Sequence, residues 1–143
     1  MIKRLAPLFS LVLALGCGTP TEVVARFEFG EAFELAVGQT ALSSDGNTTV
    51  TFARVITDSR CPSDAVCVWA GEAIVELAIS SPLPDGVDPA LANVAEPRVD
   101  VTVGAPAVIH GDRRVEVLEL TRGSTEPGRL VVPNARLRID TLP

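Results

Sequence analysis

The sequence has few of the residues on which most enzyme sites depend. It contains three cysteines, one tryptophan (Trp69) and one histidine, His110. A zinc site needs several Cys or His ligands, and this chain has no second cysteine pair to supply them. No Gly-x-Ser-x-Gly nucleophile elbow occurs either. We therefore predict no catalytic residue, no metal ligand and no cofactor, and we expect a protein that is not an enzyme.

Positive charge is also scarce. The only lysine is Lys3, and the whole chain carries a formal charge of −6. Without residues 1–16, which include two of the 12 basic side chains, 10 basic and 18 acidic side chains remain, a formal charge of −8. An acidic chain of this kind repels the phosphates of nucleic acids and of anionic lipids. We therefore expect no nucleic acid as a partner.

A long hydrophobic run is missing as well. Lys3 and Arg4 precede an uncharged apolar stretch, residues 5–15, which is about half the length that a membrane-spanning helix needs. A basic start, a short apolar core and small residues at the end are typical of a secretory signal peptide. We predict a signal peptide over 1–16 and export from the cytosol.

The end of this signal contains the first cysteine. Ala14-Leu15-Gly16-Cys17 resembles the bacterial lipobox, in which the cysteine becomes the lipidated N-terminus. We predict cleavage before Cys17, a lipid on Cys17 and a tether over 17–26, so that the membrane is a partner through the lipid. Gly18 follows where an Asp retains some lipoproteins at the inner membrane, and we therefore expect the outer membrane in a cell with two membranes.

The other two cysteines are accounted for by the same assumption. Three thiols in an exported protein leave an odd one, and lipidation of Cys17 leaves Cys61 and Cys67 as a pair. In an oxidising compartment they are expected to form a disulfide. Redox catalysis would favour Cys-x-x-Cys, whereas five residues intervene here.

The rest of the chain has the patterns of short strands. Apolar and polar residues alternate, and turn residues separate the runs. We predict one all-β domain over 27–143, an antiparallel sandwich or small barrel of about seven to eight strands, with a long Pro- and Gly-containing loop at 80–97. A phase change between Val117 and Leu118 predicts a β-bulge, and residues 135–139 predict a final edge strand.

The alternation also assigns faces. In 49–57 it places Val50, Phe52 and Ile56 on one face, and on the other face the residues Thr49, Thr51, Val55 and Thr57. In 73–79 it places the apolar residues Ala73, Val75, Leu77 and Ile79 on one side, with glutamates opposite.

The segment around the cysteine pair is the most distinctive motif. We predict that Trp69 covers the disulfide or closes one end of the core, and that Gly71 allows a close backbone approach. A second interpretation is a constrained loop that presents to a partner the residues Pro62, Ser63, Asp64, Ala65 and Val66.

This segment carries a family resemblance. Asp58-Ser59-Arg60-Cys61-Pro62, followed by Cys67-x-Trp69-Ala70-Gly71-x-Ala73, resembles the signature of a group of small bacterial secreted proteins and lipoproteins of uncharacterised function. The likeness covers residues 33–79 and is loose beyond them. It implies export and a β-rich fold, and it implies no activity.

Three hypotheses for function remain open. The first is a non-enzymatic, lipid-anchored binding or structural module of the cell envelope with an envelope protein as partner. The second is a secreted, inhibitor-like module that inserts the Cys61–Cys67 loop into a target, because a rigid loop loses less entropy on binding. The third is a small hydrolase that uses His110.

Overall fold

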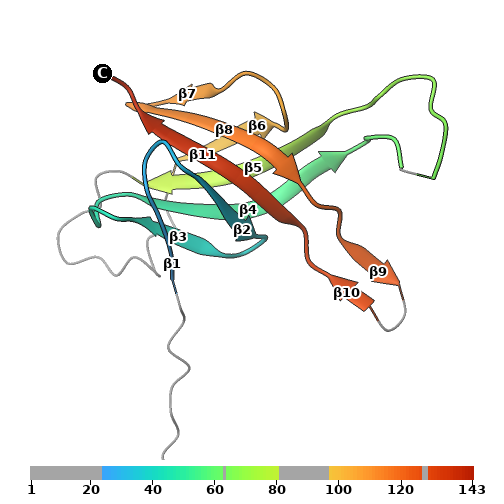
Figure 1. The fold of residues 1–143 in the computed structure, drawn as a ribbon, viewed down its shortest axis with the longest axis horizontal. Helices are drawn as coiled ribbons and strands as arrows, with labels where there is room; N and C mark the ends of the chain where they lie inside the picture. The colour runs from blue at the N-terminus through green and yellow to red at the C-terminus, as the bar shows by residue number, and fades with distance from the viewer. Residues whose placement is uncertain (1–23, 63, 81–96, 127–128) are drawn as a thin grey trace, which may run out of the picture.

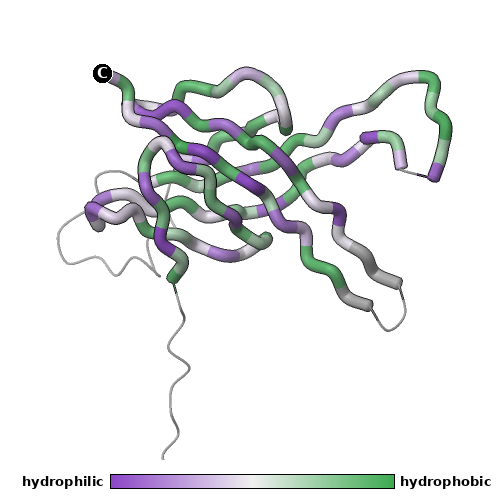
Figure 2. The backbone as a smooth tube through the Cα atoms, in the orientation of Figure 1, coloured by the Kyte–Doolittle hydropathy of each residue, from purple (hydrophilic) through white to green (hydrophobic). Residues whose placement is uncertain are grey.

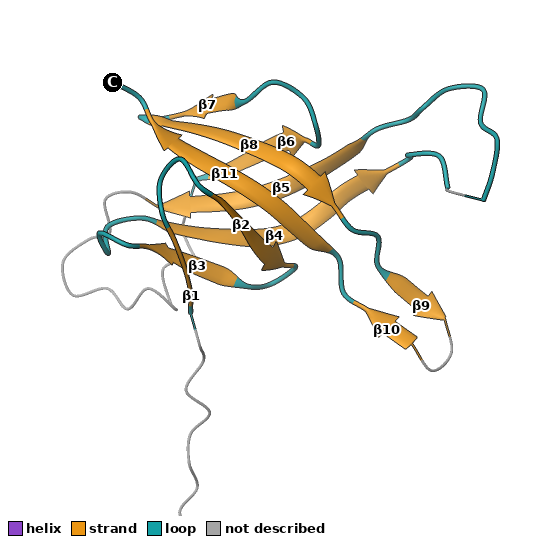
Figure 3. Ribbon diagram, viewed as in Figure 1, coloured by secondary structure: helices purple, strands orange, loops and turns teal. Residues whose placement is uncertain are grey.

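The computed structural model describes residues 24–62, 64–80, 97–126 and 129–143, and every regular element within them is a β-strand (Figure 3). The signal peptide, Cys17 and nearly all of the 80–97 loop lie outside the described residues. In chain order the strands are β1 (Ala25–Phe27), β2 (Ala32–Ala36), β3 (Thr40–Ser43), β4 (Thr49–Asp58), β5 (Ala73–Ser80), β6 (Arg98–Thr102), β7 (Val108–His110), β8 (Arg113–Leu120), β9 (Ser124–Glu126), β10 (Arg129–Val131) and β11 (Asn134–Thr141).

Two sheets form the body of the molecule, which confirms the predicted all-β sandwich. The larger has the order β1-β3-β4-β5-β6 and the smaller the order β2-β11-β8-β7 (Figure 1). All pairs in them are antiparallel except β1 with β3, which is parallel. The two sheets contain nine strands, slightly more than the sequence pattern indicates, because β1 and β7 have only three residues each.

The core lies between the two sheets, where the inward faces of both meet. The predicted face of residues 73–79 is confirmed, since Ala73, Val75, Leu77 and Ile79 are all buried. The smaller sheet contributes the buried residues Leu35, Val115, Val117, Leu120, Ala135, Leu137 and Ile139. Period-two alternation is what a half-buried strand requires, and β11 shows it throughout. In β5, Glu76 and Ala78 of the opposite face are buried as well.

The predicted faces of β4 are wrong in its second half. The register with β5 shifts between Phe52 and Arg54 and again between Val55 and Thr57, so Ala53 and Ile56 have no partner in the ladder. An extra residue moves the side chains that follow it to the opposite face until the next shift. Val55 consequently packs against the core, whereas Ile56 is 43% exposed.

Two of the three threonines assigned to the face opposite Val50 and Phe52 are buried, and the third, Thr57, is exposed. Thr49 and Thr51 are 0% and 6% exposed. The Thr51 hydroxyl lies 2.8 Å from the Thr40 hydroxyl of β3. This cross-strand hydrogen bond satisfies both polar groups, which offsets the cost of removing them from water.

The bulge predicted in β8 is confirmed. Against β11, Val117 pairs with Leu137 and Glu119 pairs with Arg136, which leaves Leu118 without a partner. The last strand, β11, is not the edge strand that the sequence suggested, because it lies between β2 and β8. An inner strand and an edge strand can both bury one face. The apolar pattern alone therefore does not show how many neighbours a strand has.

Two of the connections between strands leave the same end of the sandwich. The β4–β5 connection and the β9–β10 hairpin protrude together beyond the sheets (Figure 1). β1 includes Ala25 and Arg26, the last two residues of the segment predicted as a tether, and it starts at a different side of the molecule.

Candidate functional site

The β4–β5 connection is closed on itself by a disulfide, and we call its residues 59–71 the stapled loop. Cys61 and Cys67 are bonded, with their Cα atoms 5.8 Å apart, which confirms the predicted pair. This separation lies within the usual range for a disulfide. The loop therefore has one covalent closure near its outer end.

Backbone contacts hold the base of the stapled loop. The Ser59 amide donates to the Glu72 carbonyl at 2.8 Å, and the Cys61 amide donates to the Ala70 carbonyl at 3.0 Å. Gly71 has a φ of +67°, and a Cβ at this position would lie 1.9 Å from the Ser59 carbonyl oxygen. The close approach predicted for Gly71 is therefore present, and only glycine fits it.

Two arginines join the stem of the loop to the smaller sheet, and with Asp58 they form what we call the arginine clamp. Arg60 binds the Asp58 carboxylate through Nη2 at 2.6 Å and Nε at 2.8 Å, and its Nη1 donates to the Leu120 carbonyl of β8 at 2.9 Å. Arg122, just after β8, contacts Asp58 through Nε at 3.4 Å and donates to the Arg60 carbonyl. The loop stem is thus bonded to both sheets.

The clamp perturbs the ionisation of its carboxylate. Hydrogen bonds from the Arg60 side chain, and then from Arg122, hold the pKa of Asp58 well below its ordinary value, against the opposing effect of desolvation. The Asp58 side chain is 19% exposed. Because the folded pKa is depressed, the ionised clamp stabilises the fold above the unfolded pKa near 4, and the stabilisation falls as pH drops toward the folded pKa.

We predict that Asp58→Asn lowers the free energy of unfolding at pH 7 by about 1–2 kcal/mol, a figure reduced for solvent screening of the partly exposed arginines. The difference between wild type and variant should shrink as pH falls below about 4, where the wild-type carboxylate begins to lose its advantage. Urea titrations of both proteins from pH 7 to pH 2 measure this. A difference that stays constant over that range would contradict the assigned ion pairs.

The tip of the stapled loop is residues 62–70, and its described residues, 62 and 64–70, are exposed and mostly apolar. Val66, Val68 and Trp69 are 103%, 93% and 77% exposed, and Figure 2 shows hydrophobic colouring on this protruding segment. The prediction that Trp69 closes one end of the core is wrong, because the loop holds its indole away from the sheets. The predicted partner loop is exposed at Pro62, Asp64, Ala65 and Val66, and Ser63 lies outside the described residues.

We predict that Cys61→Ser with Cys67→Ser lowers the free energy of unfolding by about 2.4 kcal/mol, since the disulfide closes a loop of about seven residues and limits the unfolded chain. Denaturant unfolding of the double variant, compared with wild type, gives this value. Circular dichroism should show the same β content in the variant and the wild type, because the disulfide is part of neither the sheets nor the arginine clamp. Loss of the β signal would show that the disulfide has a larger role than loop closure.

A cavity of about 250 Å³ lies beside the clamp. Val55, Leu120 and Pro133 supply apolar surface to it, and Asp58 and Arg122 supply charge. This partly apolar cavity lies between the stem of the stapled loop and the stem of the β9–β10 hairpin.

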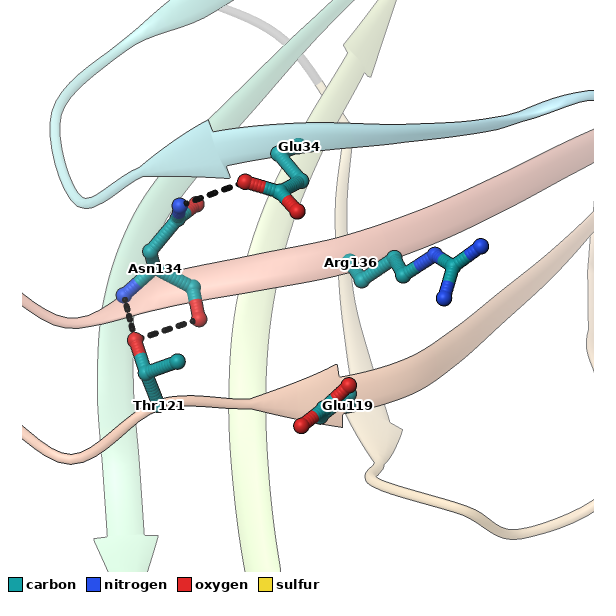
Figure 4. A pocket seen from close by; sticks show the side chains of 5 residues that line it. All are labelled: Glu34, Glu119, Thr121, Asn134 and Arg136. Atoms are coloured by element: carbon teal, nitrogen blue, oxygen red, sulfur yellow. Dashed lines mark hydrogen bonds between the residues drawn. The ribbon is translucent and has the colours of Figure 1, made fainter.

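A second, polar pocket of about 140 Å³ lies on the smaller sheet (Figure 4), and the residues that line it are Glu34, Glu119, Thr121, Asn134 and Arg136. Asn134 Nδ2 donates to Glu34 at 3.0 Å, and the Thr121 hydroxyl bonds the Asn134 backbone on both sides. These bonds join β2, β11 and the residue after β8, whereas the buried Asn134 Oδ1 has no hydrogen-bond partner among the described residues.

The remaining sequence candidates are not brought into a cluster. His110 ends β7 and is opposite Arg113 of β8. In the described part of the chain, no hydrogen bond joins His110 to a serine or a carboxylate, and no group of three or more His, Cys, Asp or Glu side chains is arranged to hold a metal. The hydrolase hypothesis stays a prediction.

Sequence reasoning missed Val68, Arg122 and Asp58 as parts of this site. Arg122 is 62 positions from Arg60, and no local pattern connects them. Among the described residues there is no helix with the length and hydropathy needed to cross a membrane. No family model, no curated protein and no solved structure matches this chain significantly.

Proposed function

We propose that this chain is an exported, lipid-anchored binding module of the cell envelope, and that the tip of the stapled loop is its contact surface. The observation that carries the proposal is the exposure of Val66, Val68 and Trp69 on a loop fixed by a disulfide and by the arginine clamp. Exposed apolar clusters on a soluble domain mark interaction sites, and tryptophan is enriched among the residues that dominate binding energy.

Rigidity supports a binding role for the loop. A partner that meets a loop already held in one conformation does not have to bear the entropy cost of ordering it. The disulfide restricts the tip, and the clamp and Gly71 restrict the stem. The same property suits the inhibitor-like alternative, in which the partner is an enzyme whose cleft receives the loop.

The proposed anchor is consistent with the cysteine pairing. Bonding between Cys61 and Cys67 leaves Cys17 as the remaining thiol. β1 begins at Ala25, eight positions after Cys17, and eight extended residues span at most about 29 Å. The domain would therefore meet partners close to the membrane surface. The resemblance of its cysteine-tryptophan segment to secreted proteins and lipoproteins supports the same location.

Cross-linking in intact cells tests the binding function. The anchored protein serves as bait, and envelope proteins are cross-linked, solubilised and recovered with it. We expect a partner that disappears when Val66→Ser, Val68→Ser and Trp69→Ser are combined. The matched control combines Ile56→Ser and Ile109→Ser, which remove exposed apolar side chains from the body of the domain. Equal recovery with all three baits would contradict the loop as the contact surface.

We predict that labelled palmitate enters the wild-type protein and not Cys17→Ser, because only the lipobox cysteine becomes the acylated N-terminus. Membrane fractionation of a bacterium with two membranes should place the wild type in the outer membrane, since Gly18 supplies no retention signal. Label in the Cys17→Ser protein equal to that in the wild type would rule out this anchor.

A further inference from the structure

The stapled loop combines an apolar tip with two exposed carboxylates. Asp64 lies within the tip, and Glu72 lies at the base of the loop. Neither forms an ion pair with any of the residues that the structure describes. Arg60 and Arg122, also at the base, bind Asp58 and backbone carbonyls. The described residues of the tip therefore include a carboxylate and no cation.

From these charges we infer the chemistry of the partner, and the inference rests on the proposed function. We propose that the stapled loop docks into an apolar cleft of an envelope protein whose rim carries lysine or arginine side chains. Val66, Val68 and Trp69 fill the cleft, and Asp64 and Glu72 face the basic rim. No basic residue occurs from Pro62 to Ala73, so Asp64 and Glu72 favour a basic rim over an acidic one.

A protein fits this surface better than a lipid bilayer does. Electrostatic attraction to anionic lipids strengthens the binding of apolar surfaces to membranes, and the described residues of this tip include no lysine or arginine. The loop also leaves the sandwich at a place well separated from the start of β1 (Figure 1).

The acidic charge also acts at a distance. The chain that remains after removal of residues 1–16 has a formal charge of −8, and complementary charge mainly raises the association rate and selects the partner. The apolar contacts then determine how slowly the complex dissociates. Replacement of the Asp64 and Glu72 carboxylates should therefore slow association with the partner. The apolar contacts of Val66, Val68 and Trp69 should remain.

Site-specific photo-cross-linking in cells tests the inference on the full, anchored protein. A photoreactive phenylalanine analogue replaces Val66, or Ile109 as a control for an exposed apolar position on β7. We expect a protein adduct from position 66 and not from 109, with lysine or arginine beside the cross-linked peptide when it is mapped by mass spectrometry. Asp64→Asn with Glu72→Gln should lower the adduct yield about five-fold, the effect of two exposed charge pairs.

The charge control is Glu28→Gln with Glu31→Gln, which removes two exposed carboxylates at the β1–β2 turn and should leave the yield unchanged. An adduct at an acidic or uncharged surface, or a yield unaffected by Asp64→Asn with Glu72→Gln, overturns the basic-rim inference and leaves the binding function intact. Absence of any protein adduct from position 66 overturns the binding function. Adducts to lipid alone overturn both.

Discussion

Trp69→Ala should weaken binding of the proposed envelope partner at least thirty-fold while it leaves the free energy of unfolding within about 0.5 kcal/mol of wild type. The side chain is 77% exposed in the free protein, so its removal takes little from the core. In a complex, the same indole would lose most of its contact with water, and central aromatic residues commonly account for about 2 kcal/mol or more of binding.

The sole tryptophan of the chain makes this measurement direct. Emission from Trp69 reports only on the loop tip, and it should shift to shorter wavelength when the purified partner is added. Calorimetric titration then gives the dissociation constants of wild type, Trp69→Ala and the matched control Ile109→Ala, which removes an exposed apolar side chain elsewhere. Equal affinities for Trp69→Ala and wild type would exclude the indole from the interface.

Gly71→Ala, which adds one methyl group, should lower the free energy of unfolding more than alanine at another glycine with positive φ does. An alanine at a φ of +67° is strained by about 1–2 kcal/mol. Its Cβ would also lie 1.9 Å from the Ser59 carbonyl oxygen, closer than any real contact allows. The Cβ is fixed to the backbone at position 71, and the oxygen belongs to the backbone of Ser59, so the clash can be relieved only if the two sides of the stem separate. We expect a total cost of about 3 kcal/mol or more.

Gly104→Ala is the matched control for that variant. Gly104 has a similar φ of +73°, but nothing lies within 4 Å of a Cβ built there. It should therefore show the conformational strain alone, about 1–2 kcal/mol. Denaturant unfolding of both variants gives the comparison, and partner binding should fall only for Gly71→Ala. Equal destabilisation by the two substitutions would contradict the close packing at Ser59.

Predictions from the sequence succeeded where one residue pattern has one structural meaning. The alternation through Ala73, Val75, Leu77 and Ile79 places these residues in the core in any sheet that buries one face. The pairing of Cys61 with Cys67 followed from the number of thiols and their compartment. The bulge at Leu118 followed from a phase change that no regular strand can accommodate.

Predictions failed where tertiary contacts decide. The bulge at Ala53 has no signature in the sequence, and so Ile56 was assigned to the wrong face. Trp69 is largely apolar, and an apolar side chain favours the core. The disulfide and the arginine clamp nevertheless hold the loop, and Trp69 with it, away from the core. The clamp itself depends on Arg122, which approaches Arg60 only after two sheets have packed.

The position of β11 has a consequence for how this domain is made. β11 is the last strand along the described chain, and yet it is the shared neighbour of β2 and β8. Until β11 is in place, β2 and β8 have no hydrogen-bonded partner along the side that faces it. The core around Leu35, Val115 and Val117 is then incomplete. Pairing of β2 with β11 joins segments about 100 positions apart, and such distant contacts form slowly. The smaller sheet of this domain is therefore completed late in folding, after the rest of the described chain has formed.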